Sequence, residues 1–129
     1  MIDLVFDTNI LVYLGQKNQK YLDFVSHETS GKKIGISVIS SIEVLVWATT
    51  NLERAQLRED LSLFETLPLT EEIGLQCAIN LSKQKQASLR NPKFADIIIA
   101  NTALFYGVPL VTNNAKDFKV FKGLKVIVP

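Results

Sequence analysis

The stretch "LVFDTNILVYL", residues 4–14, is an apolar run interrupted by three consecutive polar residues, Asp7, Thr8 and Asn9. Residues 3–7 are short and apolar and predict a buried strand, and the residues that follow turn helical. A buried ionised carboxylate is costly unless it is paired, hydrogen-bonded or bound to a metal. Asp7 is therefore either a helix cap at the edge of the core or part of a site.

The rest of the chain alternates between short apolar strands and helices. Further strands are expected over 33–39, 108–112 and 124–128, and 67–69 is compatible with a short one. Helices are expected over 8–15, 20–29, 40–50, 53–67, 70–84 and 94–107, with a loop over 87–93 and a loop or short helical turn over 113–118. This order predicts an α/β fold with a mainly parallel sheet, in which ligands bind at the carboxyl ends of the strands.

Composition narrows the class of protein. A chain of 129 residues, 47% hydrophobic, predicts one compact domain over 1–129 with a full core. A net charge of +1 excludes a coat protein that binds nucleic acid by bulk positive charge, but not a nuclease, because divalent metals supply positive charge locally. The single cysteine, Cys77, excludes an internal disulfide and favours a reducing, cytoplasmic compartment. No signal peptide or membrane span is expected.

Three of the 13 acidic residues are embedded in apolar sequence at element junctions. Asp7 ends the first strand, Glu43 falls in the first turn of the helix after the second strand, and Asp96 begins an apolar helix. A fourth, Asp117, lies in the loop after strand 108–112. In a parallel α/β sheet all four are expected on the same rim.

Each of these carboxylates also has a purely structural interpretation. Asp7 can cap a helix, Glu43 with Ser40 matches the S-x-x-E capping box, Asp96 suits a helix dipole, and Asp117 is typical of a solvated loop. Together, however, four converging carboxylates repel one another and need protons, basic partners or cations. Oxygen ligands without His or Cys favour Mg²⁺ or Mn²⁺, which suits phosphodiester hydrolysis.

Four segments of the chain resemble the PIN-domain family, and specifically its toxins of VapC type. They are "DTNILVYL", "SVISSIEVL", "FADIIIANTALFYGVPLVTNNAKDF" and "GLKVIV", and they span nearly the whole chain. The opening D-T-N alone is a weak signal, whereas the long third segment with the upstream Glu in register is specific. The resemblance implies an α/β/α sandwich and an Mg²⁺- or Mn²⁺-dependent endoribonuclease that cuts RNA, often tRNA or rRNA. It also implies a homodimer that a cognate antitoxin neutralises.

The family's acidic positions match those singled out above. By resemblance, Asp7 and Asp96 are the main metal ligands, Glu43 helps to hold the metal or orient its water, and Asp117 matches the acidic residue of the last loop. No Ser, Cys or His nucleophile is needed, and the lone histidine, His27, is expected on a helix surface.

The family also has polar positions that orient the carboxylates or the scissile phosphate, and here they match Thr8, Asn9, Thr112 and Asn113. The chain departs from the pattern at Asn114, where other members carry an Asp. The resemblance therefore implies a less negative site here.

Two surfaces are predicted to contact partners. Near the proposed rim, lysines suited to RNA phosphates are Lys116, Lys119 and Lys122, although solvated lysines are equally common. Apolar side chains that exceed what one small core covers indicate a dimer face and are Leu45, Val46, Trp47 and Leu57. Trp47 is nevertheless more typical of a core than of an interface.

The sequence lacks residues that two other classes of α/β protein with Asp-rich pockets require. A receiver domain needs an adjacent acidic pair, and a phosphatase of the haloacid dehalogenase type needs an Asp at the place of Asn9, so both are disfavoured. A non-catalytic PIN-like module that binds RNA or a protein stays open. The retained Asp7, Glu43 and Asp96 argue against that module, and Asn114 argues for it.

Overall fold

The computed structural model describes residues 1–86 and 93–129, so the loop expected over 87–93 lies outside the described residues except for Lys93. Its centre is a five-stranded sheet in which every pair of neighbouring strands is parallel and the order is β3-β2-β1-β4-β5. The strands are β1 (Leu4–Phe6), β2 (Ile34–Ser37), β3 (Glu65–Leu67), β4 (Leu110–Val111) and β5 (Val126–Ile127). The predicted α/β fold with a parallel sheet is confirmed.

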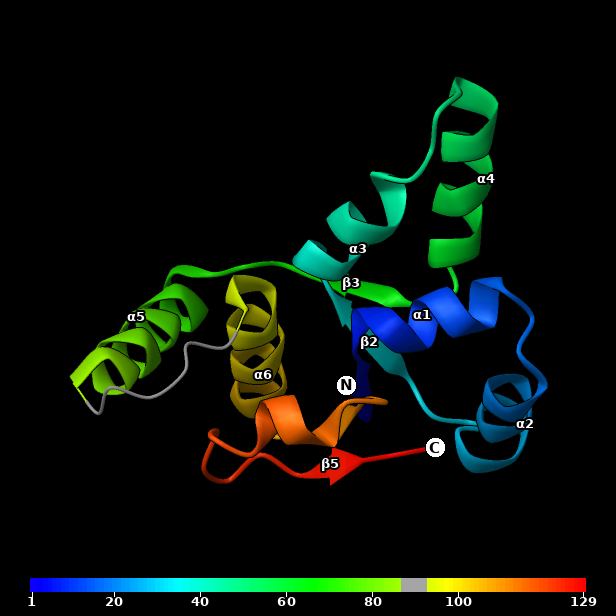
Figure 1. Ribbon diagram of the computed structural model, residues 1–129. Helices are drawn as coiled ribbons and strands as arrows, with labels where there is room; N and C mark the ends of the chain where they lie inside the picture. The colour runs from blue at the N-terminus through cyan, green and yellow to red at the C-terminus, as the bar shows by residue number, and fades with distance from the viewer. Residues whose placement is uncertain (87–92) are drawn as a thin grey trace.

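Helices cover both faces of the sheet, which makes an α/β/α sandwich. They are α1 (Thr8–Gly15), α2 (Gln19–Glu28), α3 (Val38–Leu45), α4 (Asn51–Leu61), α5 (Glu71–Gln86) and α6 (Phe94–Tyr106), with a 3-10 helix, η1 (Ala115–Phe118). Figure 1 shows α5 and α6 on one side of the sheet and α1 and α2 on the other, while α3 and α4 extend away from it.

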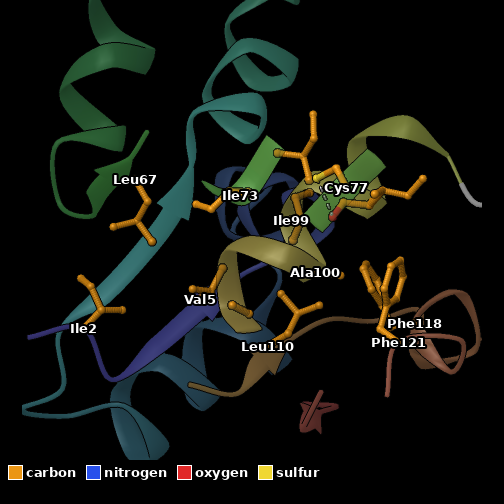
Figure 2. Close-up of a cluster of buried hydrophobic side chains, with 13 residues drawn as sticks. Ile2, Val5, Leu67, Ile73, Cys77, Ile99, Ala100, Leu110, Phe118 and Phe121 are labelled. Atoms are coloured by element: carbon orange, nitrogen blue, oxygen red, sulfur yellow. Dashed lines mark hydrogen bonds between the residues drawn. The ribbon is translucent and has the colours of Figure 1, made fainter. Parts of the chain in front are cut away.

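Alternation along the strands explains the two apolar layers. In β1, Leu4 and Phe6 join the cluster formed with α1, α2 and α4, whereas Val5 joins the cluster formed with α5 and α6. Figure 2 shows this second cluster, with Val5 and Leu110 beside α6. Because both faces of β1 are covered, all three of its residues are buried, as is typical of strands in parallel sheets.

Two helix predictions were wrong at their ends. The helix expected over 40–50 begins earlier, at Val38, because the Ser37 hydroxyl accepts a hydrogen bond from the Ile39 N–H and caps it, and it ends at Leu45. The helix expected over 53–67 ends at Leu61, and the strand near its end is Glu65–Leu67 instead of 67–69. Pairing with β2 holds this segment extended.

Apolar side chains remain exposed where α3 leads into α4. Val46 is 72% and Trp47 is 77% exposed, as expected for an apolar face outside the core, while Leu45 and Leu57 are half-buried. His27 is exposed, as expected for a helix surface. Over the described ranges, no helix combines the length and the apolar character needed to cross a membrane.

Candidate active site

Asp7 stands at the carboxyl end of β1 and is both a helix cap and a buried carboxylate. Its Oδ1 accepts a hydrogen bond of 2.7 Å from the Thr8 N–H at the start of α1, so it does cap this helix. Its Oδ2 accepts from the Thr112 hydroxyl at 2.7 Å and from the Asn9 amide at 3.2 Å. The carboxylate is therefore fixed by donors from α1 and from the residue after β4, and only 5% of the residue is exposed.

Glu43 is tied to the same region through Thr8. The Thr8 hydroxyl lies 2.7 Å from Glu43 Oε1 and 2.9 Å from the hydroxyl of Ser40, which is fully buried. The capping-box interpretation of Glu43 was wrong, because α3 is capped by Ser37 and Glu43 falls in its second turn. Glu43 faces α1 instead of its own helix terminus.

Asp96 lies in the first turn of α6 and is strongly affected by its surroundings. Burial, and after it the charges of Asp7, Asp117 and, less strongly, Glu43, together raise the pKa of this carboxyl from its ordinary value of 3.8 to about 6. Lys93, at the N-terminus of α6, opposes this shift. Three carboxylates from separate parts of the chain thus lie within electrostatic reach of Asp96.

The pKa of Asp7 is raised as well, and burial is the largest cause. The hydrogen bonds from Thr112 and the Thr8 N–H favour the ionised form, but the charges of Glu43 and Asp117 disfavour it. Asp117 itself is exposed on η1. The site therefore concentrates negative charge around two partly or fully buried carboxyls.

The loop after β4 forms the other wall of this arrangement. Thr112 is fully buried, its hydroxyl accepts from the Asn114 N–H at 3.0 Å, and the Asn113 N–H donates to Asn9 Oδ1 at 3.2 Å. Asn114 is exposed and contributes this bond through its backbone.

Sequence reasoning missed two tyrosines at this loop. The Tyr21 hydroxyl donates to Asn113 Oδ1 at 2.9 Å, and the Asn113 amide donates to the Tyr13 hydroxyl at 3.4 Å. Both tyrosines occupy apolar positions of helical patterns, which predict only packing. The signal available was chemical: a buried phenol needs a partner for its hydroxyl.

The three predicted RNA-contacting lysines lie in η1 and in the segment directly after it. Phe118 and Phe121 are buried and anchor this segment to the core, with ring centroids 6.2 Å apart. The intervening and flanking side chains are left exposed, among them Lys116, Lys119 and Lys122.

The donor set suits a hard divalent cation, although no cage is preformed. Within residues 1–86 and 93–129, no three His, Cys, Asp or Glu side chains gather closely enough to enclose a metal ion. Mg²⁺ is usually held by one or two carboxylates together with waters, so a pair such as Asp7 and Asp96 fits its needs. Their oxygens, crowded by like charge, are also the groups that a cation would relieve.

A shallow hollow elsewhere on the surface is unrelated to these carboxylates. It has a volume of about 510 Å³ and lies between residues 31–34 and 62–65. These residues precede or begin β2 and β3, at the amino end of the sheet, whereas the carboxylates lie at its carboxyl end.

Comparison with known proteins identifies the family. The model of the PIN domain matches residues 4–124, and no curated protein shows significant sequence similarity. Among solved structures, VapBC2 of Rickettsia felis bound to promoter DNA has a TM-score of 0.83 at 24% identity and matches over 100% of this chain and 99% of its own. A toxin–antitoxin complex from Klebsiella pneumoniae has a TM-score of 0.75 at 28% identity, over 97% and 96%. VapBC-1 of Haemophilus influenzae has a TM-score of 0.83 at 22% identity, over 99% and 98%. The resemblance to VapC-type proteins is thus confirmed in the fold, and the chain belongs to the PIN-domain family.

Proposed function

We propose that this protein is a metal-dependent endoribonuclease, a VapC-like toxin that hydrolyses phosphodiester bonds of tRNA or rRNA and is neutralised by a cognate antitoxin in the cytoplasm. The observation that carries the proposal is that the charges of Asp7, Asp117 and Glu43 all act on the partly buried Asp96, whose pKa is raised to about 6 by burial and by these charges. Such crowding of oxygen donors at the carboxyl end of a parallel sheet is typical of a cation site. The similarity in fold to toxin–antitoxin complexes supports the biological role.

In this proposal each side chain of the site has its own role. Asp7 and Asp96 would hold Mg²⁺ or Mn²⁺, which when bound lowers the pKa of a water and offsets charge on the leaving oxygen. Glu43 would help to hold the metal or orient the attacking water, and Thr8 fixes its Oε1 at 2.7 Å. Thr112 fixes Oδ2 of Asp7 in the same way. Asp117 adds negative charge from η1.

The negative charge of the site opposes the binding of a negatively charged RNA substrate. The four carboxylates repel a phosphodiester, so the bound cation and nearby lysines must supply the attraction. Lys116 lies in η1 next to Asp117, and Lys119 and Lys122 follow η1 on the chain. All three are exposed, and in this proposal they contact phosphates flanking the cleaved bond.

Cleavage of RNA by the purified, antitoxin-free protein tests the proposal. We expect cleavage of RNA with Mg²⁺ or Mn²⁺, none with EDTA, and none by the Asp7→Asn variant. Failure of the folded wild-type protein to cut a broad panel of tRNA and rRNA would contradict it.

The second candidate is a non-catalytic PIN-like module that binds RNA or a protein. Two observations favour it: Asn114 stands where relatives are expected to be acidic, and no three acidic side chains in the described parts of the chain enclose a metal position. This module would bind RNA equally well in Mg²⁺ and in EDTA and would show no turnover in either.

A further inference from the structure

We infer that the stacked pair Tyr13–Tyr21 is a positioning clamp for the site: it holds Asn113, which through Asn9 fixes the orientation of the Asp7 carboxylate. The clamp itself is a matter of hydrogen bonds and packing. Its consequence for catalysis rests on the proposed function.

Tyr13 and Tyr21 together hold the side-chain amide of Asn113. The Tyr13 and Tyr21 rings are stacked, with centroids 4.5 Å apart and planes 5° from parallel. Their hydroxyls engage both ends of one amide, since Tyr21 donates to Asn113 Oδ1 at 2.9 Å and Asn113 Nδ2 donates to Tyr13 at 3.4 Å. Both ends of the amide are thereby held, because each phenol hydroxyl can donate or accept a hydrogen bond.

Asn9 links Asn113 to the Asp7 carboxylate. Holding the side chain of Asn113 also places its backbone N–H, which donates to Asn9 Oδ1 at 3.2 Å. With its oxygen occupied in this way, Asn9 must direct its amide nitrogen the other way, toward Asp7 Oδ2 at 3.2 Å and the Thr112 hydroxyl at 3.4 Å. The orientation of Asn9 thus depends on the loop that the tyrosines hold.

The clamp joins parts of the chain that the strands alone do not fix. Tyr13 and Tyr21 belong to α1 and α2, whereas Asn113 lies 92 residues beyond Tyr21 in the loop after β4. The same loop leads into η1, where the Asp117 N–H donates to the Asn114 carbonyl at 3.1 Å. Tyr21 is only 4% exposed, and the partner that the structure gives its hydroxyl is Asn113.

A purely structural role predicts something different. If Tyr21 only fills the core, its ring contributes packing, and removal of the hydroxyl changes the stability of the fold but not the activity. If it positions the site, the same change loosens the support of a metal-holding carboxylate. Loss of such supporting groups lowers activity by about 10- to 100-fold in metal sites.

Kinetics with Tyr21→Phe, Asn113→Ala and the double variant test the clamp, with Tyr106→Phe as the matched control. Tyr106 ends α6 and packs against the apolar cluster, so its variant loses the same hydroxyl away from the site. We expect Tyr21→Phe to lower kcat about tenfold with little change in KM, and Tyr106→Phe to leave both unchanged. In the Asn113→Ala background, Tyr21→Phe should have no further effect, because the route through Asn113 is already broken.

A spectroscopic arm on the metal-free protein does not depend on cleavage. The Asn9 side-chain amide should give distinct NMR signals that shift in Tyr21→Phe, although Tyr21 and Asn9 share no hydrogen bond in the network above, and stay in place in Tyr106→Phe. Unmoved Asn9 signals, or a Tyr21→Phe variant altered only in its unfolding temperature, would overturn the clamp. If wild-type protein cuts no RNA while the Asn9 signals shift as expected, the proposed function fails and the clamp stands.

Discussion

Asp7 uses its two carboxylate oxygens for two different purposes. Oδ1 caps α1 through the Thr8 N–H, and Oδ2 receives the Thr112 hydroxyl and the Asn9 amide. The cap and the site are therefore not alternatives at this residue. A sequence alone cannot separate them, because both demand a short acidic side chain directly before a helix.

Substitution can separate the cap from the charge. Asn is as good an N-cap as Asp, so Asp7→Asn should keep the stability of the fold within about 1 kcal/mol while it abolishes metal-dependent cleavage. Asp7→Ala loses the cap as well and should cost a further 0.5–2 kcal/mol, roughly, in chemical denaturation. Equal stability of the two variants would show that the cap contributes nothing.

The raised pKa of Asp96 predicts how stability depends on pH without metal. Folding raises this pKa from 3.8 to about 6, so between these values the folded protein holds a proton that the unfolded chain has released. Raising the pH through this window therefore favours unfolding. Asp96→Asn removes the effect, and its unfolding temperature should exceed that of wild type by a margin that grows from pH 3.8 to 6 and is constant above.

Two controls belong to this pH experiment. Below pH 3.8 both carboxyl and amide are neutral, so wild type and Asp96→Asn should unfold at the same temperature. Added Mg²⁺ should stabilise wild type more than the variant, because a ligand stabilises only the fold that binds it. A margin that does not vary with pH would show that Asp96 ionises normally.

How far residues could be predicted depended on whether their neighbours in sequence are also their neighbours in space. Asp7, Thr8 and Asn9 act together and are consecutive, so their importance was visible in one short stretch. The partner of Glu43 was misassigned because Ser37 and Ser40 both offer a cap, and only the true start of α3 decides between them. Tyr21 could not be linked to Asn113, since nothing local marks that pairing.

At the level of elements, the strands and most helices follow from local pattern, but the region 53–67 does not. Apolar residues at 57, 61, 64 and 67 fit a helical period throughout. In the structure the chain leaves the helix after Leu61 and its last part pairs with β2, where Gly35 lies opposite Glu65. A contact between distant segments thus overrides the local preference.

The close approach of β2 and β3 gives a prediction for Gly35. A Cβ placed on Gly35 would lie 2.6 Å from Cδ1 of Leu67 and 3.3 Å from Cγ2 of Ile2, both buried. Gly35→Ala should therefore destabilise the protein by about 1–3 kcal/mol in chemical denaturation. Gly74→Ala, in α5 with open space around the added methyl, is the control and should be neutral or stabilising by up to about 1 kcal/mol. If both changes have the same effect, packing against Leu67 is not what excludes a side chain.

On the surface of the whole molecule, a group of apolar side chains is exposed to solvent where α3 leads into α4. They are Ile42, Val46, Trp47 and Leu52, between 57% and 82% exposed. A patch of this kind on a small protein is typical of an interface. We propose that a second copy of the chain covers it.

The mass of the protein in solution tests this homodimer. We expect wild type to sediment as a dimer, and Trp47→Lys to sediment as a folded monomer, because Trp47 is 77% exposed and contributes little to its own core. Phe105→Lys, which alters a 48% exposed aromatic on α6, should leave the dimer intact. A wild-type mass that stays monomeric at every concentration would reject the homodimer.

The distribution of charge over the molecule predicts which lysines bind RNA. A net charge of +1 gives the protein little general attraction for RNA, so binding must depend on a few lysines near the site. We expect reversal of Lys116, Lys119 or Lys122 to Glu to weaken RNA binding and to flatten its dependence on salt. Each lost phosphate contact should reduce the slope of log affinity against log salt by about 0.7 for single-stranded RNA.

Binding is measured in the Asp96→Asn background so that the RNA stays intact. Lys32→Glu, just before β2 at the amino end of the sheet, carries the same change of charge and should leave the slope unaltered. Equal slopes for all four reversals would mean that RNA approaches from another face.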